Sequence, residues 1–99
     1  MVEYSLKKET ENNFILETDE VIVDLDRNEF GYINDFVNLN RGCFLTLKGE
    51  NEAYLQLEEN SEIITISPVV NFKTPKRDIV IHLTYDEYMP QLVDVLCNY

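Results

Sequence analysis

The sequence is poor in the residues that interrupt chains and in those that perform chemistry. Its 99 residues include no tryptophan, three glycines, three prolines, two cysteines and one histidine. With so little glycine and proline no linker divides the chain, and we expect a single domain over residues 1 to 99. No apolar run approaches the roughly 18 to 20 residues of a membrane span, and residues 1 to 8 lack the apolar core of a secretory signal.

The two cysteines are too few for a disulfide framework and too far apart for a CxxC pair. Cys43 and Cys97 both have apolar neighbours, where a free cysteine usually behaves as a small buried hydrophobe. We therefore predict buried free thiols in a reducing cytoplasm. His82 stands alone, so zinc has no histidine pair, and its alternation with apolar residues places it on the surface of a strand.

Catalytic and metal-binding motifs are also missing. The patterns GxGxxG, GxxxxGK[ST], GxSxG and HExxH do not occur. Residues 24 to 28 begin like a calcium loop, but Glu29 stands where the loop needs glycine and Asp35 where it needs a bidentate glutamate. We expect no enzyme activity, no metal and no cofactor, and we interpret residues 24 to 28 as a strand end followed by a helix cap.

Negative charge dominates what is present. The chain has 19 acidic residues against eight basic ones, a net charge of −11 at pH 7. Residues 9 to 62 hold 14 of the acids and three of the bases, so this stretch carries the whole imbalance. Such a surface repels nucleic acid and anionic membranes, which bind through lysine and arginine. It attracts a basic protein partner instead.

Apolar patterns predict the elements of the first half. Residues 4 to 6 and 14 to 16 are expected to form two short strands around a polar turn, and residues 21 to 25 a half-buried strand. Helical spacing of apolar residues then predicts an amphipathic helix over residues 28 to 40. Asp26 or Asn28 would cap this helix, and Arg41 with Gly42 would stop it.

Three strands are predicted to follow as an antiparallel meander, over residues 43 to 47, 53 to 57 and 62 to 67. Polar turns at residues 48 to 52 and 58 to 61 separate them. The inward face is expected to hold Leu45, Leu47, Leu55, Leu57, Ile64 and Ile66. The outward face would hold Phe44, Thr46, Tyr54, Gln56, Ile63 and Thr65, and its apolar members suggest partial cover by a helix or a partner.

The last third is predicted to be a strand followed by a helix. A stretch bounded by Pro68 and Pro75, with a brief edge strand at residues 69 to 72, precedes a strand at residues 78 to 83. Residues 84 to 87 match a capping box. They start a helix to about residue 97, interrupted or begun afresh at Pro90. Its sheet-facing residues would be Tyr88, Leu92, Val95 and Leu96.

This order of elements predicts an α+β fold. It would have an antiparallel sheet of about five to six strands, one helix after the early strands and one C-terminal helix.

The acidic residues of the predicted turns are the candidate functional residues. Solubilising charge is their ordinary role, whereas the functional alternative is that they steer a basic protein to an interface. Tyr32 on the helix and Tyr54 beside the turns are added as aromatic anchors. The predicted partner-binding set is Asp19, Glu20, Tyr32, Glu50, Glu52, Tyr54, Glu58, Glu59 and Glu62.

The arrangement of these elements resembles a known group of proteins in general type. A small acidic chain with a helix over residues 28 to 40, a stop at Arg41 and Gly42, paired strands over residues 43 to 47 and 53 to 57, and a closing helix resembles the immunity proteins of bacterial toxin systems. Such proteins bind and block a cognate toxin, often a basic nuclease. The resemblance implies an inhibitor whose carboxylates cover a basic toxin.

Two other hypotheses remain open at this point. The chain could be a nucleic-acid mimic that occupies a DNA-binding enzyme, which predicts carboxylates spaced like phosphates along an elongated face. It could also be an assembly subunit whose exposed Phe44, Tyr54 and Ile63 pack against a copy of itself. Monomer and homodimer are therefore both compatible with the sequence.

Overall fold

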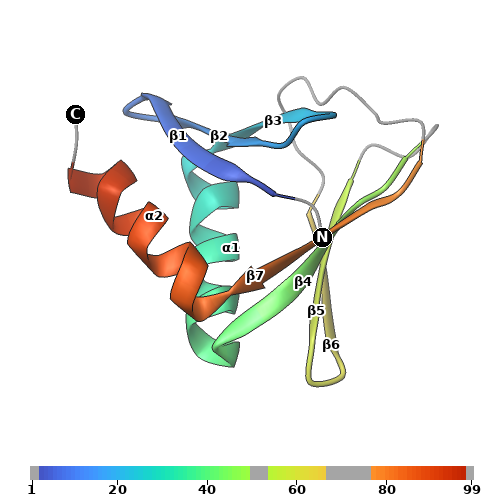
Figure 1. The fold of residues 1–99 in the computed structure, drawn as a ribbon. Coiled ribbons are helices and arrows are strands. Elements are labelled where there is room, and N and C mark those ends of the chain that lie inside the picture. Colours follow the sequence, from blue (N-terminus) through green and yellow to red (C-terminus); the bar gives the residue numbers. More distant parts are fainter. Residues whose placement is uncertain (1–2, 50–53, 67–76, 98–99) are drawn as a thin grey trace.

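The computed structural model describes residues 3–49, 54–66 and 77–97, and these residues form strands and helices in two layers of sheet with helices between and beside them (Figure 1). The elements are β1 (Ser5–Thr10), β2 (Asn13–Glu17), β3 (Ile22–Asp26), α1 (Arg27–Asn40), β4 (Gly42–Leu47), β5 (Leu55–Glu59), β6 (Glu62–Ile66), β7 (Ile79–Thr84) and α2 (Tyr85–Cys97). Neither helix has the length and apolar character needed to cross a membrane. An α+β fold is therefore confirmed.

The strands form two antiparallel sheets, so the prediction of one sheet with about five to six strands was wrong. A three-stranded sheet has the order β1-β2-β3, and a four-stranded sheet has the order β6-β5-β4-β7. The sheets are separate because α1 begins directly after β3 and leads the chain from the three-stranded sheet to β4, which pairs with β5 and β7 instead. Figure 1 shows the three-stranded sheet at the top and the β5–β6 hairpin at the bottom.

Helix α1 has well-defined ends, as the sequence predicted. The Asp26 carboxylate accepts a 2.8 Å hydrogen bond from the Glu29 N–H, and the Glu29 side chain accepts a 2.9 Å hydrogen bond from the Asp26 N–H. This reciprocal capping box satisfies two backbone donors at the helix start and selects Asp26 over Asn28 as the cap. Arg41 ends the helix in the left-handed conformation with φ 60°, and Gly42 follows with φ 126°.

The core lies where α1 packs between the two sheets. The rings of Phe14 on β2 and Phe30 on α1 stack with centroids 4.1 Å apart. Towards the other sheet, Leu45 and Leu47 of β4 and Ile81 of β7 are fully buried. One apolar cluster therefore joins both sheets to the helix.

The β5–β6 hairpin is tighter than predicted. Its loop is the two residues Asn60 and Ser61, both with positive φ, and Glu58 and Glu59 belong to β5. A two-residue loop with this backbone matches the twist of paired strands. Leu55, Leu57 and Ile66 are buried as predicted, whereas Ile64 is exposed because β6 is the edge strand and its middle extends past the core.

Helix α2 is continuous through Pro90, so the predicted break there was wrong. Tyr88, Leu92 and Val95 are buried, and the Tyr88 hydroxyl donates a hydrogen bond to the Asn34 side chain of α1. Leu96, predicted to face the sheet, is 50% exposed because it lies about 100° around the helix from Val95.

The two cysteines differ in burial. Cys97 is exposed, which corrects its predicted burial, whereas Cys43 is buried.

Several predicted features lie outside the described residues: Glu50 and Glu52, the start of the strand predicted over residues 53 to 57, the end of the strand predicted over residues 62 to 67, and the edge strand at residues 69 to 72 with Pro68 and Pro75. The described part of the second strand begins at Leu55 and that of the third ends at Ile66. The capping box at residues 84 to 87 stays a prediction.

Candidate binding surface

Three of the predicted partner-binding residues lie together on the β5–β6 hairpin. Glu59 and Glu62 face each other in register next to the two-residue loop. Glu58 lies between Phe44 on β4 and Ile63 on β6. None of the three acids forms an ion pair with another residue in the described ranges. The hairpin therefore presents carboxylates without an ion-pair partner on both faces, with Glu58 on the face of Phe44 and Ile63 and with Glu59 and Glu62 on the opposite one.

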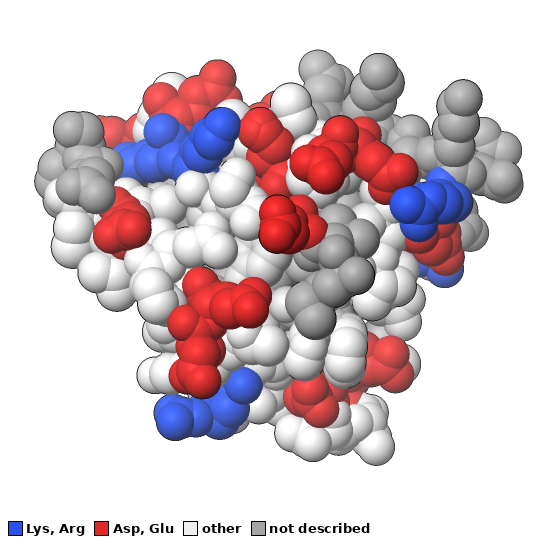
Figure 2. All heavy atoms as spheres, viewed as in Figure 1, with Lys and Arg blue, Asp and Glu red and all other residues white. Residues whose placement is uncertain are grey.

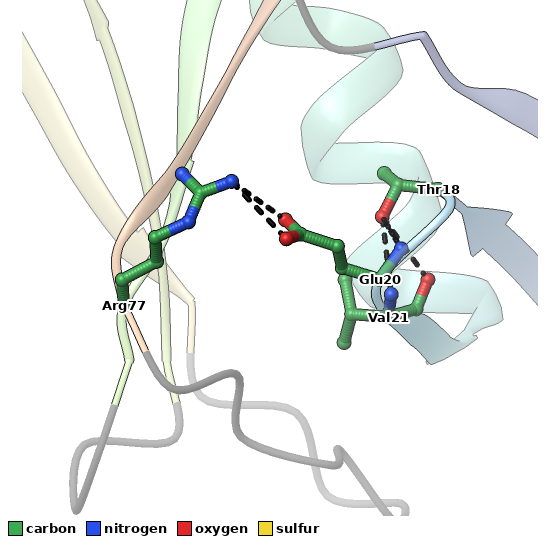
Figure 3. A network of polar contacts seen from close by, with 4 residues as sticks. All are labelled: Thr18, Glu20, Val21 and Arg77. Carbon is green, nitrogen blue, oxygen red and sulfur yellow. Dashed lines mark hydrogen bonds and ion pairs between the residues drawn. The ribbon is translucent and has the colours of Figure 1, made fainter.

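Asp19 and Glu20 lie at the opposite end of the four-stranded sheet, in the turn between β2 and β3 (Figure 3). The Thr18 hydroxyl accepts hydrogen bonds from the N–H groups of Glu20 and Val21, which shapes this turn. The Glu20 carboxylate pairs with Arg77, just before β7, at 3.0 Å. At about 3.3 Å per residue, the length of β4 separates this turn from the hairpin acids by roughly 16 Å or more.

The two predicted aromatic anchors are also apart. Tyr32 is 60% exposed on α1. Tyr54 is half-buried before β5, where its carbonyl accepts a 3.1 Å hydrogen bond from the Lys48 N–H. The described members of the predicted set therefore do not form one patch. Figure 2 shows the same feature on the face in view, where acidic side chains form separate groups with basic side chains near some of them.

The outward face of the four-stranded sheet is the feature that the sequence reasoning only partly identified. Phe44 on β4 lies opposite His82 on β7, and their rings stack with centroids 4.3 Å apart. Phe44 is 44% exposed and Ile63 is 56% exposed, and Val80 is exposed beside them. The predicted strand position of His82 is confirmed. Both described helices pack on the other face, so neither supplies the partial cover predicted from a helix or a partner, and cover by a partner stays a prediction.

Register explains why this stack was missed. Strand alternation puts Phe44 on one face of β4 and His82 on one face of β7. The contact between them depends on β4 pairing with β7 across more than 30 positions of sequence, which local patterns do not specify. The sequence did contain one indication of the shared face, because Phe44 and His82 each alternate with buried residues along their own strands.

The charges on the strands of this face are negative, and basic residues lie just beyond the two ends of β4. The strands of the four-stranded sheet contain no lysine or arginine, whereas Glu58 lies within the face. Lys48 follows β4 at the far end, and its ammonium lies 3.0 Å from the Asp78 carboxylate. At the other end Arg41 precedes β4, and its guanidinium lies 4.2 Å from the centre of the Tyr85 ring, so acids predominate around the exposed side chains without excluding cations.

A surface hollow of about 550 Å³ adjoins the same face at His82. Its lining includes three carboxylates, from Glu3 before β1 and from Asp86 and Glu87 in the first turn of α2. The Tyr4 hydroxyl oxygen is buried and has no hydrogen-bond partner within the described ranges. Burial, with the Glu87 carboxylate adding to it, raises the pKa of Tyr4 to about 12. The hollow is thus lined by acidic residues that can accept hydrogen bonds from a cation, whereas the Tyr4 hydroxyl is buried beneath it.

The remaining candidate metal-binding and nucleophilic groups, two aspartates and a cysteine, have structural positions in strands and at a helix start. Asp24 lies in β3 and Asp26 caps α1, as the sequence predicted for this segment. Burial, with the Glu59 carboxylate adding to it, raises the pKa of Cys43 to about 12, which keeps this thiol protonated and unreactive. Within the described residues, no three His, Cys, Asp or Glu side chains converge as metal ligands would.

Comparisons of the chain with protein-family models, curated proteins and solved structures give no significant match.

Proposed function

We propose that the chain is a protein-binding inhibitor of the immunity-protein type, which neutralises a basic toxin by covering it with an acidic surface. The observation that carries the proposal is the net charge of −11, combined with uncompensated carboxylates beside exposed aromatic side chains. Charges of one sign speed the encounter with an oppositely charged protein. Aromatic side chains supply the affinity once the surfaces meet.

A binding role is better supported than a catalytic one. The His82 ring stacks on Phe44, and Cys43 is buried with a raised pKa. These groups offer no nucleophile and base in contact, which catalysis of the Ser-His or Cys-His kind requires.

Self-association is the second candidate, favoured by the exposure of Phe44 and Ile63. Sedimentation at high protein concentration tests it, because a dimer that Phe44→Ala dissociates would support it. The nucleic-acid mimic has less support, because the acidic side chains form separate groups on the face seen in Figure 2 and the molecule measures 35 × 30 × 24 Å, which is not markedly elongated.

The proposed function is tested by capture and neutralisation. The immobilised chain is exposed to an extract of the native host at low salt, and bound proteins are eluted with rising salt. We expect a basic protein that elutes as screening increases. That protein should arrest growth when produced alone in a bacterial host, and co-production of this chain should restore growth. An acidic or neutral partner, or persistent arrest, would contradict the proposal.

A further inference from the structure

The outward face of the four-stranded sheet has the composition of an interface centre. Phe44 and His82 stack at its β4–β7 side, and Ile63 lies at its β6 edge. The next row across the strands holds Val80, Thr46, Gln56 and Thr65. Interface centres combine exposed aromatic groups with few charges, and their rims are polar. This face follows that pattern, with one internal charge at Glu58.

Charge indicates which occupant this face fits. In a symmetric dimer, each residue of the face meets the same face of its copy. Both copies would then bring a Glu58 carboxylate into the contact, and the four strands carry no lysine or arginine to offset these charges. A basic protein instead brings the missing cations. Charge complementarity therefore favours a basic partner over a second copy.

Size indicates how far the contact extends. Four strands about 4.8 Å apart and five residues long cover roughly 300 Å² of sheet. Stable interfaces bury about 800 Å² on each partner. The contact must therefore spread beyond the sheet, and the border next to β7 carries acids, Asp86 and Glu87 in the hollow beside His82.

We infer that a basic protein docks on the outward face of the four-stranded sheet, with Phe44 stacked on His82 as the central contact and with a lysine or arginine of the partner in the hollow lined by Glu3, Asp86 and Glu87. This inference rests on the proposed function and specifies its surface. It assigns partner binding to a defined face of the sheet rather than to the predicted acidic turns, and of the hairpin acids only Glu58 belongs to this face.

A peptide probe tests the location without knowledge of the partner. Hexa-arginine amide is titrated at low salt into the full ¹⁵N-labelled chain, and amide shifts are mapped by NMR. We expect the largest changes at Phe44, Glu58, His82, Asp86 and Glu87. Changes centred on the turn at Asp19 and Glu20, or spread evenly over the chain, would overturn the inference.

Matched variants separate local contact from net charge. Glu58→Lys and Asp35→Lys change the charge equally, but Asp35 is exposed on α1, outside the face. We expect Glu58→Lys to weaken peptide binding about tenfold and Asp35→Lys less than about twofold. Equal effects would overturn the inference. Phe44→Ala and Tyr32→Ala extend the comparison to the captured protein, where only Phe44→Ala should weaken binding.

The outcomes distinguish the two levels of proposal. Peptide shifts on the predicted face without any captured toxin would retain the surface and contradict the toxin-inhibitor function. A captured basic toxin whose binding is unchanged by Phe44→Ala and Glu58→Lys would retain the function and overturn the surface. A wild-type dimer that Phe44→Ala dissociates would make a second copy the occupant and overturn it as well.

Discussion

The Gly49 N–H donates a 2.9 Å hydrogen bond to the Asp78 carboxylate, which ties the chain after β4 to the residue before β7. Lys48 contacts the same carboxylate at 3.0 Å. These two partners, the backbone bond first, hold the pKa of Asp78 below its ordinary value. Gly49 is required at this point, because a Cβ there would lie 2.5 Å from the Arg77 backbone.

Asp78→Asn should lower the free energy of unfolding at pH 7, because the amide binds the Lys48 ammonium more weakly. The pKa of Asp78 is lower in the folded state than in the unfolded chain, so its stabilising contribution is present above pH about 4 and is lost as the pH falls further. Urea unfolding of both proteins at several pH values measures this. The difference should shrink in acid, and Asp94→Asn on the exposed side of α2 should show none.

Asp26→Ala should destabilise the protein by about 1 kcal/mol, because it removes the cap from α1. For a domain of this size that corresponds to a fall in melting temperature of roughly 4 to 8 °C. Thermal unfolding followed by circular dichroism gives the value. Asn28→Ala, an exposed substitution in the same helical turn, is the control, and an equal loss there would contradict the capping role.

Phe30→Ala should cost about 3 to 5 kcal/mol, because it removes the ring that stacks on Phe14 and leaves a cavity between α1 and the three-stranded sheet. Tyr32→Ala, two residues later on the exposed side, should cost less than about 0.5 kcal/mol. Chemical denaturation of the two variants provides the comparison. Similar losses would mean that the packing of α1 differs from the one described.

Glu62→Lys should raise stability by about 0.5 kcal/mol, because it replaces a facing pair of carboxylates by an opposite-charge pair with Glu59. The gain should diminish as salt rises from 0.05 to about 0.5 M, since surface pairs are screened. Unfolding curves at the two salt concentrations test this. Glu11→Lys, in the exposed turn between β1 and β2, controls for the change in net charge.

Alkali should destabilise the fold from pH about 9 upwards. Burial raises the pKa of Cys43 and of Tyr4 to about 12, and it raises that of Tyr88 as well. The folded protein therefore keeps protons that the unfolded chain releases, and stability falls as the pH rises. Cys43→Ala should move the onset to pH about 10, where tyrosine begins to titrate. Cys97→Ala should not move it, and a flat profile between pH 8 and 11 would contradict the cause.

Local patterns in the sequence predicted the elements well and their assembly less well. The segment from Asp26 to Gly42 carries its own start and stop signals, so α1 was placed to within one residue. The division into two sheets depends on which strand pairs with β4, and no short-range signal specifies that β7 does. Leu96 and Ile64 were misplaced because apolar character alone does not fix burial: Leu96 lies around the helix from the buried Val95, and Ile64 lies on the edge strand β6.

The candidate surface shows the same limit. Turn acids such as Glu58 and Glu62 were recognisable from composition, and their grouping on one hairpin follows from the short loop between them. Asp19 and Glu20 have the same composition, but the fold places them at the other end of the sheet. The hollow beside His82 could not be predicted, because it joins Glu3 near the start of the chain to Asp86 and Glu87 near its end.

The pairing of β4 with β7 also determines which strand edge stays unpaired while the chain is being synthesised. The three-stranded sheet and α1 consist of neighbouring segments, which can associate as soon as they emerge. The β7 side of β4 can pair only after β7 has been synthesised, because Leu47 of β4 lies in register with Ile79 of β7. A nascent chain stopped before Ile79 would therefore present β4 as an open strand edge, the kind of template on which aggregation begins.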